Sequence, residues 1–261
     1  MSGELAGRVV AVTGGHRGIG RAITEAMAEA GAAVVIGCRD PGSAVDVVAA
    51  QQQLGRVVSA AACEVTDDAS TRAWAATVQE RHGRVDVVVA NAGIAGPTKP
   101  LHEIDPAEWR ECVDVDLTGV YLTFRPFLAS MISQRSGRLI AVSSVTAKRP
   151  LVGRTPYAAA KMGIIGLVRT LAAEVGPYGI CANTVCAGSV AGPRLDAVVA
   201  TAAAARGISA DEARREHEAP AALQRLVRAE EVARTCVFLA SEAASAITGE
   251  DLNVSAGAVM Y

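Results

Sequence analysis

Short runs of apolar residues alternate along the chain with longer segments in which apolar residues recur every three or four positions. The short runs are rich in Val, Ile and Ala and are nearly continuous. Such runs are typical of parallel strands that are buried on both faces. We therefore predict seven strands, at residues 8–13, 33–36, 57–61, 85–90, 138–143, 180–185 and 251–254.

The segments between these runs carry the signals of helices. Apolar residues recur every four positions over 19–27, and Gly31 follows, which predicts a helix that ends near this glycine. Asp105 precedes Pro106 and lies three residues before Glu108, the pattern of a helix N-terminus. The alternation predicts an α/β fold, a doubly wound parallel sheet with helices on both faces. Since no linker or repeat divides the chain, we expect a single domain over 1–261.

Residues 188–223 form a longer segment than a single connection between a strand and a helix requires. They predict two short helices, one from near Arg194 to Arg206 and one that begins after Ser209. An insertion at the carboxyl end of a strand lies where open α/β sheets bind ligands. We interpret 188–223 as a substrate lid, and the alternatives are a contact between subunits or a simple excursion of the chain.

Composition excludes several classes of function. Hydrophobic residues make up 51% of the chain but aromatic residues only 3%, which argues against a surface that binds by aromatic stacking. The net charge of −2 lacks the basic excess of a nucleic-acid binder. No apolar run is long enough to span a membrane, and the first residues do not resemble a signal peptide.

The six cysteines form no Cys-x-x-Cys pair, and the four histidines are scattered along the chain. This pattern predicts no metal site. It favours free thiols in a reducing compartment, and we expect a cytoplasmic protein.

A glycine-rich turn follows the first predicted strand and leads directly into a helix. It reads Thr13-Gly14-Gly15-His16-Arg17-Gly18-Ile19-Gly20. Glycines allow the backbone to approach a pyrophosphate, and the helix N-terminus offers free N–H groups and the positive end of its dipole. Taken alone, the motif is also compatible with a tight turn that binds no ligand.

The spacing Thr-Gly-x-x-x-Gly-Ile-Gly resembles that of the short-chain dehydrogenase/reductase family, and the resemblance extends from about Leu5 to the C-terminus. Further motifs follow in the family's order: Asn91-Ala92-Gly93, Ser144, Tyr157-x-x-x-Lys161 and Cys186-Ala187-Gly188. The resemblance implies a Rossmann-like fold. It also implies an oxidoreductase that transfers hydride between a nicotinamide cofactor and a carbonyl or secondary-alcohol substrate.

The resemblance assigns catalytic roles. Tyr157 is the acid/base, Lys161 its electrostatic partner and ribose ligand, and Ser144 the residue that orients the substrate oxygen. Tyr157 and Lys161 are four residues apart and share one side of a helix whose predicted cap is Thr155. Asp116 stands where the family has a catalytic Asn. We expect its extra negative charge near Lys161 to leave activity in place and to change its pH profile.

The resemblance also implies the cofactor contacts. The glycine turn holds the pyrophosphate, Glu64 and Val65 flank the adenine, and the Val190 N–H bonds the nicotinamide carboxamide. The residues implied to bind the cofactor are Gly14, Arg17, Gly18, Ile19, Gly20, Arg39, Glu64, Val65, Asn91, Gly93, Tyr157, Lys161 and Val190.

The end of the second strand distinguishes NAD from NADP. An acidic residue there would bind the ribose 2′-OH of NAD and repel a 2′-phosphate. In the family's pattern Cys38 takes this place, and Arg39 follows it. Together with Arg17, Arg39 offers two guanidinium groups to one phosphate, so we predict NADP(H) in preference to NAD(H). In the alternative, Arg39 is merely solvated and Asp40 binds the ribose.

The substrate is less constrained. Lys148, Arg149 and Arg154 lie between Ser144 and Tyr157 and either attract an acidic group or are solvated loop charges. We predict a ketone reductase or an alcohol or polyol dehydrogenase, with a 3-oxoacyl thioester reductase as a variant of this function.

Two other classes of function stay open. They are a dinucleotide-sensing protein without catalysis and a lyase or epimerase on the same scaffold. The resemblance further implies a homotetramer or dimer, a small-molecule substrate, and no nucleic-acid or membrane partner.

Overall fold

The computed structural model of the chain describes residues 3–261, apart from the side chains of residues 201, 202 and 205. Met1 and Ser2, the first residues of the predicted domain, lie outside the described residues. The strands occupy the predicted places, with ends shifted by no more than two residues. They are β1 (Val9–Thr13), β2 (Ala33–Cys38), β3 (Val58–Ala62), β4 (Val87–Ala90), β5 (Gly137–Ser144), β6 (Ile180–Ala187) and β7 (Asp251–Val254).

These strands form one parallel sheet in the order β3-β2-β1-β4-β5-β6-β7. The chain begins at β1 inside the sheet, winds outward through β2 and β3, and then returns to β4 on the other side of β1. The prediction of a Rossmann-like, doubly wound sheet is thus confirmed. The reversal between β1 and β4 creates the crevice in which open α/β sheets bind their ligands.

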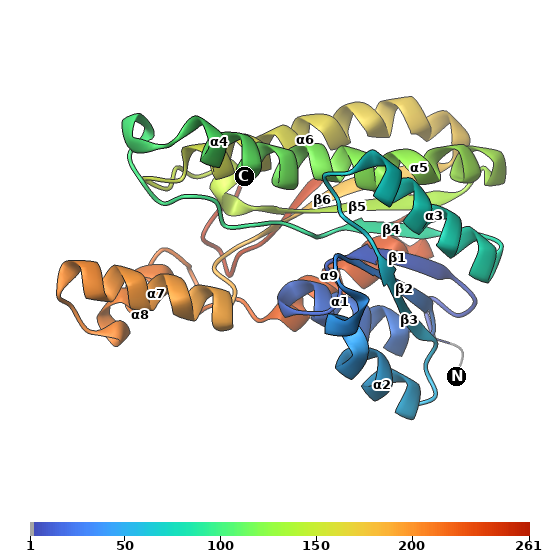
Figure 1. Cartoon of the computed structure of the whole chain (residues 1–261), viewed down its shortest axis with the longest axis horizontal. Coiled ribbons are helices and arrows are strands. Elements are labelled where there is room, and N and C mark those ends of the chain that lie inside the picture. Colours follow the sequence, from blue (N-terminus) through green and yellow to red (C-terminus); the bar gives the residue numbers. More distant parts are fainter. Residues whose placement is uncertain (1–2) are drawn as a thin grey trace.

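Helices cover both faces of the sheet (Figure 1). One face carries α1 (Gly18–Glu29), α2 (Val45–Gln53) and α9 (Ala229–Ala240). The other carries α3 (Asp68–His82), α4 (Pro106–Val113), α5 (Gly119–Gln134) and α6 (Thr155–Val175). Two further helices, α7 (Pro193–Arg206) and α8 (Ala210–Glu218), follow β6 and project away from the sheet.

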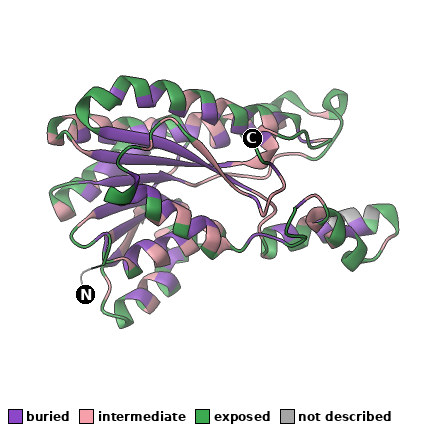
Figure 2. Ribbon diagram, turned by 180° about the vertical axis from the view of Figure 1, so that it is seen from behind, coloured by how far each residue is buried: buried purple, intermediate pink, exposed green. Residues whose placement is uncertain are grey.

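The core is aliphatic, as the composition requires. Successive strand residues alternate between two apolar clusters, because neighbouring side chains of a strand point to opposite faces. Val10 and Val12 pack with α1 and α9, whereas Val9 and Ala11 face α3, α5 and α6. Figure 2 shows the strands buried between the two helix layers.

The helix ends follow the predicted signals with one exception. Gly31 after α1 has a φ of 95°, and Asp105 and Glu108 form a reciprocal capping box at α4. The prediction of Thr155 as the cap of α6 is wrong, because Arg154 occupies that position. The Arg154 carbonyl already accepts the Ala158 N–H at 2.8 Å, so the helical bonding begins one residue earlier.

Two segments differ from what the apolar pattern predicts. The sixth strand continues through Cys186 and Ala187, since both pair with β5 on one side and with β7 on the other. A π-helical turn at Asp114–Thr118 joins α4 to α5 without a break. Such turns are frequent at functional sites, and this one carries Asp116.

All six cysteines are buried free thiols. Burial raises the pKa of Cys63 and of Cys236 to about 12, so both thiols are protonated at neutral pH. No helix within residues 3–261 is long and apolar enough to cross a lipid bilayer.

Candidate active site

The glycine turn wraps the N-terminus of α1 at the carboxyl end of β1. Gly14 and Gly18 have φ values of 66° and 54°, which favour glycine. At Gly20 a Cβ would lie 2.2 Å from the Gly14 carbonyl oxygen, so only glycine allows this close approach. No side chain caps the start of α1, which leaves its first N–H groups available to an anion. The turn therefore fits a pyrophosphate.

The loop after β4 is bonded to the end of β1. Asn91 Nδ2 donates to the carbonyls of Thr13 and Gly14 at 3.0 and 3.4 Å. In return, Thr13 Oγ1 accepts the backbone N–H groups of Asn91 and Ala92 at 3.1 and 3.2 Å. Asn91 and Thr13 thus fix the shape of the crevice. The sequence signal for Thr13 was a polar residue at the end of a buried strand.

Tyr157 and Lys161 lie one turn apart on α6, above the end of β5. Lys161 Nζ is 5.5 Å from the centre of the Tyr157 ring and donates to the Val142 carbonyl at 3.3 Å. Ser143 Oγ donates to the Lys161 carbonyl at 2.9 Å and so ties α6 to the strand. The Arg154 guanidinium covers the Tyr157 ring at 4.8 Å and donates to the Ala95 carbonyl.

Ser144 is the last residue of β5, one residue beyond the predicted end of this strand. Its Oγ donates to Thr146 Oγ1 and accepts the Thr146 N–H, both at 3.1 Å. These bonds hold the hydroxyl at the strand end, within the turn that leads toward α6.

Asp116 is completely buried and connects the loop after β4 with Lys161. Its Oδ1 lies 3.5 Å from Lys161 Nζ and accepts the Ile94 N–H at 3.1 Å. Cys112 Sγ donates to Oδ2 at 3.6 Å, and burial with the neighbouring carboxylate raises the pKa of this thiol to about 12. A Cβ at Gly93 would meet Asp116 Oδ1 at 2.4 Å, so glycine is required there too.

The charges of Arg17 and Arg39 both act on His16, which lies in the glycine turn, and the charge of Asp40 opposes them. Burial lowers the pKa of His16, and the charges of both arginines lower it further. Its Nδ1 is buried with no hydrogen-bond partner among the described residues. Asp40 Oδ1 accepts the Gly42 N–H at 2.9 Å and so caps the short turn that follows. Sequence reasoning assigned no role to His16.

The remaining predicted cofactor residues lie on three other loops. Glu64 Oε1 accepts the N–H and the hydroxyl of Thr66 at 3.2 and 3.0 Å, which fixes the loop after β3. Val65 packs closely against Gly119. A Cβ at Gly119 would lie 3.0 Å from Cγ2 of Val65. Val190 pairs with Val227 in a parallel bridge. The hydrogen bonds of this bridge join Val227 to the residues before and after Val190, so the N–H of Val190 itself faces away from Val227.

Arg194, at the start of α7, donates to the Gly93 carbonyl at 2.8 Å. This bond joins the segment after β6 to the loop after β4, on opposite sides of β5. In the sequence, Arg194 marks only the start of a predicted helix. Within residues 3–261, no group of three or more His, Cys, Asp and Glu side chains is arranged to hold a metal ion.

Known proteins resemble this chain over nearly its whole length. A family model described as enoyl-(acyl carrier protein) reductase matches residues 14–259. A cis-4-hydroxycyclohexanecarboxylate dehydrogenase of Sinomonas cyclohexanicum is 40% identical over 257 residues, 98% of each chain. A 3-oxoacyl-[acyl-carrier-protein] reductase of Vibrio harveyi is 35% identical over 98% of this chain and 99% of its own. The chain belongs to the short-chain dehydrogenase/reductase family.

Solved structures agree with this assignment. A variant of actinorhodin polyketide ketoreductase solved with NADPH has a TM-score of 0.93 and 30% identity, and covers both chains completely. Levodione reductase has a TM-score of 0.92 and 30% identity over 98% of this chain and all of its own. As a short-chain dehydrogenase/reductase, the protein is an oxidoreductase that acts on hydroxyl or keto groups. The catalytic prediction is confirmed, and the non-catalytic alternative is not supported.

The carboxylate of Asp116 yields a prediction about this short-chain dehydrogenase/reductase. In Asp116→Asn the amide has nearly the same shape, so we expect activity to persist. We expect the rising, acid-side limb of the pH–rate profile, which follows deprotonation of Tyr157, to move to lower pH by about one unit, because a like charge no longer opposes formation of the Tyr157 phenolate. The profile of kcat/KM for alcohol oxidation measures this shift. Asp114→Asn is the matched control, since Asp114 lies in the same turn but is exposed; equal profiles for both variants would contradict the prediction.

Proposed function

We propose that the protein is an NADP(H)-dependent reductase of small ketones that also oxidises the corresponding secondary alcohols. The observation that carries the proposal is the buried connection from Asp116 through Lys161 to Tyr157, beside Ser144 at the crevice. A phenol beside an ammonium group is suited to move a proton to or from a substrate oxygen.

The bound nicotinamide supplies or accepts the hydride, and the side chains manage the proton. Ser144 Oγ donates a hydrogen bond to the substrate oxygen once it exchanges its bond to Thr146. The Tyr157 hydroxyl gives its proton to the alkoxide as charge develops there, and in the oxidation direction the Tyr157 phenolate takes that proton back. Lys161 stabilises the resulting phenolate, and Asp116 positions the ammonium group.

We assign the cofactor to the crevice between the glycine turn and the loops after β2, β3, β4 and β6. The open N-terminus of α1 and the close approach at Gly20 support pyrophosphate binding there. The outward N–H of Val190 supports its bond to the carboxamide. The full set proposed is Gly14, Arg17, Gly18, Ile19, Gly20, Arg39, Glu64, Val65, Asn91, Gly93, Tyr157, Lys161 and Val190.

NADP(H) is the proposed partner because Arg39 directly follows β2, Arg17 lies in the glycine turn, and the charges of both act on His16. Among the described residues, neither guanidinium has a carboxylate partner, which leaves both free to bind a 2′-phosphate. The capping bond of Asp40 supports a local structural role for that carboxylate instead of ribose binding.

The proposed substrate is a small alicyclic ketone or its alcohol. The relative from Sinomonas cyclohexanicum is named for a secondary alcohol on a cyclohexane ring. A carrier-protein thioester is the second candidate, favoured by the relative from Vibrio harveyi.

A substrate scan that follows NADPH absorbance tests the proposal. We expect turnover of substituted cyclohexanones at rates well above that of acetoacetyl-coenzyme A. Faster turnover of the thioester would favour the second candidate. NADPH binding without turnover of any ketone, alcohol or thioester would refute the oxidoreductase proposal for this site.

Residues 188–223 form the proposed substrate lid within a single domain. Helices α7 and α8 pack on each other through a small apolar cluster of their own that includes Leu195, Val199 and Ala213. The hydrogen bond from Arg194 to Gly93 holds the start of α7 across the crevice. The apolar cluster between the two helices supports a segment that opens and closes as one unit.

A homotetramer is the proposed assembly, with a dimer as its smaller form. Ala159, Met162 and Gly166 are exposed along α6, beside the exposed Tyr121 of α5. A Cβ at Gly166 would meet no atom within 4 Å, so a second copy can approach this face closely. Light scattering is expected to give the mass of four chains, and a monomer would contradict the proposal. The six free thiols support a cytoplasmic location.

A further inference from the structure

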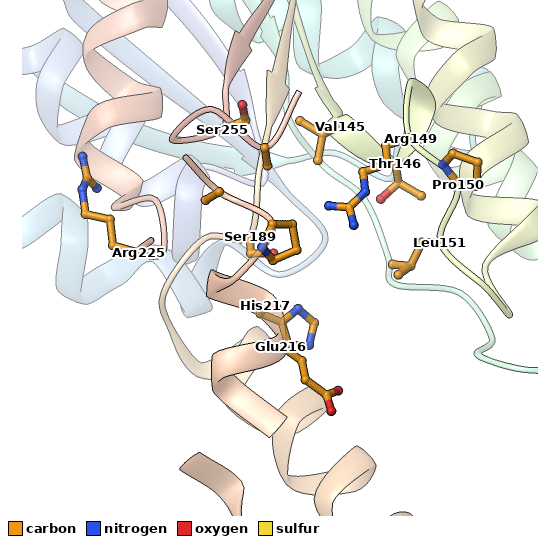
Figure 3. Close-up of a pocket in the computed structure, with 13 residues that line it drawn as sticks. Val145, Thr146, Arg149, Pro150, Leu151, Ser189, Glu216, His217, Arg225 and Ser255 are labelled. Carbon is orange, nitrogen blue, oxygen red and sulfur yellow. The ribbon is translucent and has the colours of Figure 1, made fainter. Parts of the chain in front are cut away.

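A cavity of about 250 Å³ lies between the turn after β5, the turn after β7 and the end of α8. Figure 3 shows the Arg149 guanidinium pointing into this space, with His217 and Leu151 on its other walls. The volume is just below the range of about 300–1,000 Å³ that is usual for ligand pockets. It suits a small molecule.

The cavity opens beside the proposed catalytic serine. Thr146 lines it, and Thr146 Oγ1 is 3.1 Å from Ser144 Oγ. A substrate whose reacting oxygen lies at Ser144 therefore extends the rest of its structure into this space. Apolar side chains, among them Val145, Leu151 and Ala258, provide a wall for a hydrocarbon ring.

Most charged groups around the cavity are already neutralised. Arg225 donates two hydrogen bonds to the Glu231 carboxylate at 2.9 and 2.7 Å. Glu216 accepts two from Arg206 at 2.6 and 2.7 Å. The charge of each of these lining residues is therefore balanced by a partner within the protein.

The two other basic residues of the turn after β5 are also engaged. Lys148 forms an ion pair with Asp251, and both side chains are buried. The Arg154 guanidinium bonds Thr98 and the Ala95 carbonyl.

Arg149 differs from all of these. Its backbone N–H donates to the Val145 carbonyl at 2.7 Å, but its guanidinium has no carboxylate partner among residues 3–261. Burial lowers the pKa of His217, so the neighbouring imidazole is neutral at pH 7 and does not repel the guanidinium. The result is an exposed positive charge with several hydrogen-bond donors at the edge of a cavity whose lining also includes apolar side chains.

We propose that Arg149 binds a carboxylate on the substrate and that the enzyme prefers keto and hydroxy monocarboxylic acids to their neutral analogues. The inference rests on the proposed function, because it assumes that the reacting oxygen lies at Ser144. The planar guanidinium matches a carboxylate through two parallel hydrogen bonds, and the apolar wall receives the ring between the two ends.

Binding to the enzyme loaded with NADP⁺ tests the carboxylate site without turnover. In titration calorimetry, cyclohexanecarboxylate should bind about 10- to 100-fold more tightly than cyclohexanecarboxamide. Arg149→Gln should remove this difference, and Arg149→Lys should keep part of it, since lysine retains the charge but not the planar pair of donors. Within residues 3–261 no ion pair includes this guanidinium, so folding should not depend on it. Arg72→Gln on α3, an exposed arginine remote from the cavity, is the matched control.

Turnover separates this inference from the proposed function. With 4-oxocyclohexanecarboxylate and its methyl ester, the ratio of kcat/KM should favour the acid in the wild type and fall toward one in Arg149→Gln, chiefly through KM. Equal binding of acid and amide by the wild type would overturn the carboxylate site even if both ketones react. Tight, Arg149-dependent binding of the acid without turnover of either ketone would instead refute the proposed function.

Discussion

Tyr157→Phe is expected to lower turnover by about 10²- to 10⁴-fold or more, the usual contribution of a positioned acid or base. The phenyl ring keeps the packing of Tyr157 under the Arg154 guanidinium and near Lys161. Only the proton donor is removed, so the alkoxide that forms on hydride transfer finds no acid within reach. Binding of NADPH should change little, because the pyrophosphate and adenosine contacts lie on the loops after β1 to β4.

The measurement pairs steady-state kinetics with NADPH binding followed by fluorescence. Tyr178→Phe is the matched control, because Tyr178 is partly exposed in the turn before β6. That variant should keep wild-type turnover. If Tyr157→Phe keeps it as well, Tyr157 is not the proton donor. If it loses NADPH binding together with turnover, the Tyr157 hydroxyl serves chiefly to hold the cofactor.

The strands were predictable because burial on both faces leaves long, nearly uninterrupted runs of Val, Ile and Ala. The capping box at Asp105 and Glu108 was equally readable, since it depends only on residues three apart. The start of α6 was not. Thr155 is a good capping residue, but the carbonyl of Arg154 already serves the first helical bond. That choice depends on the tertiary contacts of the buried Arg154 side chain with the loop after β4.

The candidate site, like the fold, was predictable from the sequence only in part. Motif spacing placed Tyr157 and Lys161 on one side of a helix, as local geometry dictates. It did not find Arg194, whose bond to Gly93 joins segments about a hundred residues apart in sequence. Nor did it separate Arg149 from Lys148 and Arg154. The three are alike in sequence and differ only in the ion pairs and carbonyls that the fold brings to each.

Arg39→Asp is expected to reverse the proposed cofactor preference. The wild type should use NADPH with a kcat/KM about 100-fold above that for NADH, since two charge-assisted contacts to a phosphate contribute on the order of 3 kcal/mol. In the variant, the new carboxylate would repel the 2′-phosphate and accept hydrogen bonds from the ribose hydroxyls of NADH. The loss should fall on KM for NADPH, because the nicotinamide end of the site is untouched.

The ratio of kcat/KM for the two cofactors is the quantity to measure, at low and at high ionic strength. Salt should reduce the NADPH preference of the wild type, since Arg39 is exposed and its charge is screened. Arg234→Asp on α9 is the control, because this exposed arginine makes the same charge change on a helix away from the end of β2. It should leave the ratio in place. A wild type that prefers NADH, or an Arg39→Asp variant that still prefers NADPH, would show that Arg39 is a solvated residue and would return the ribose to Asp40.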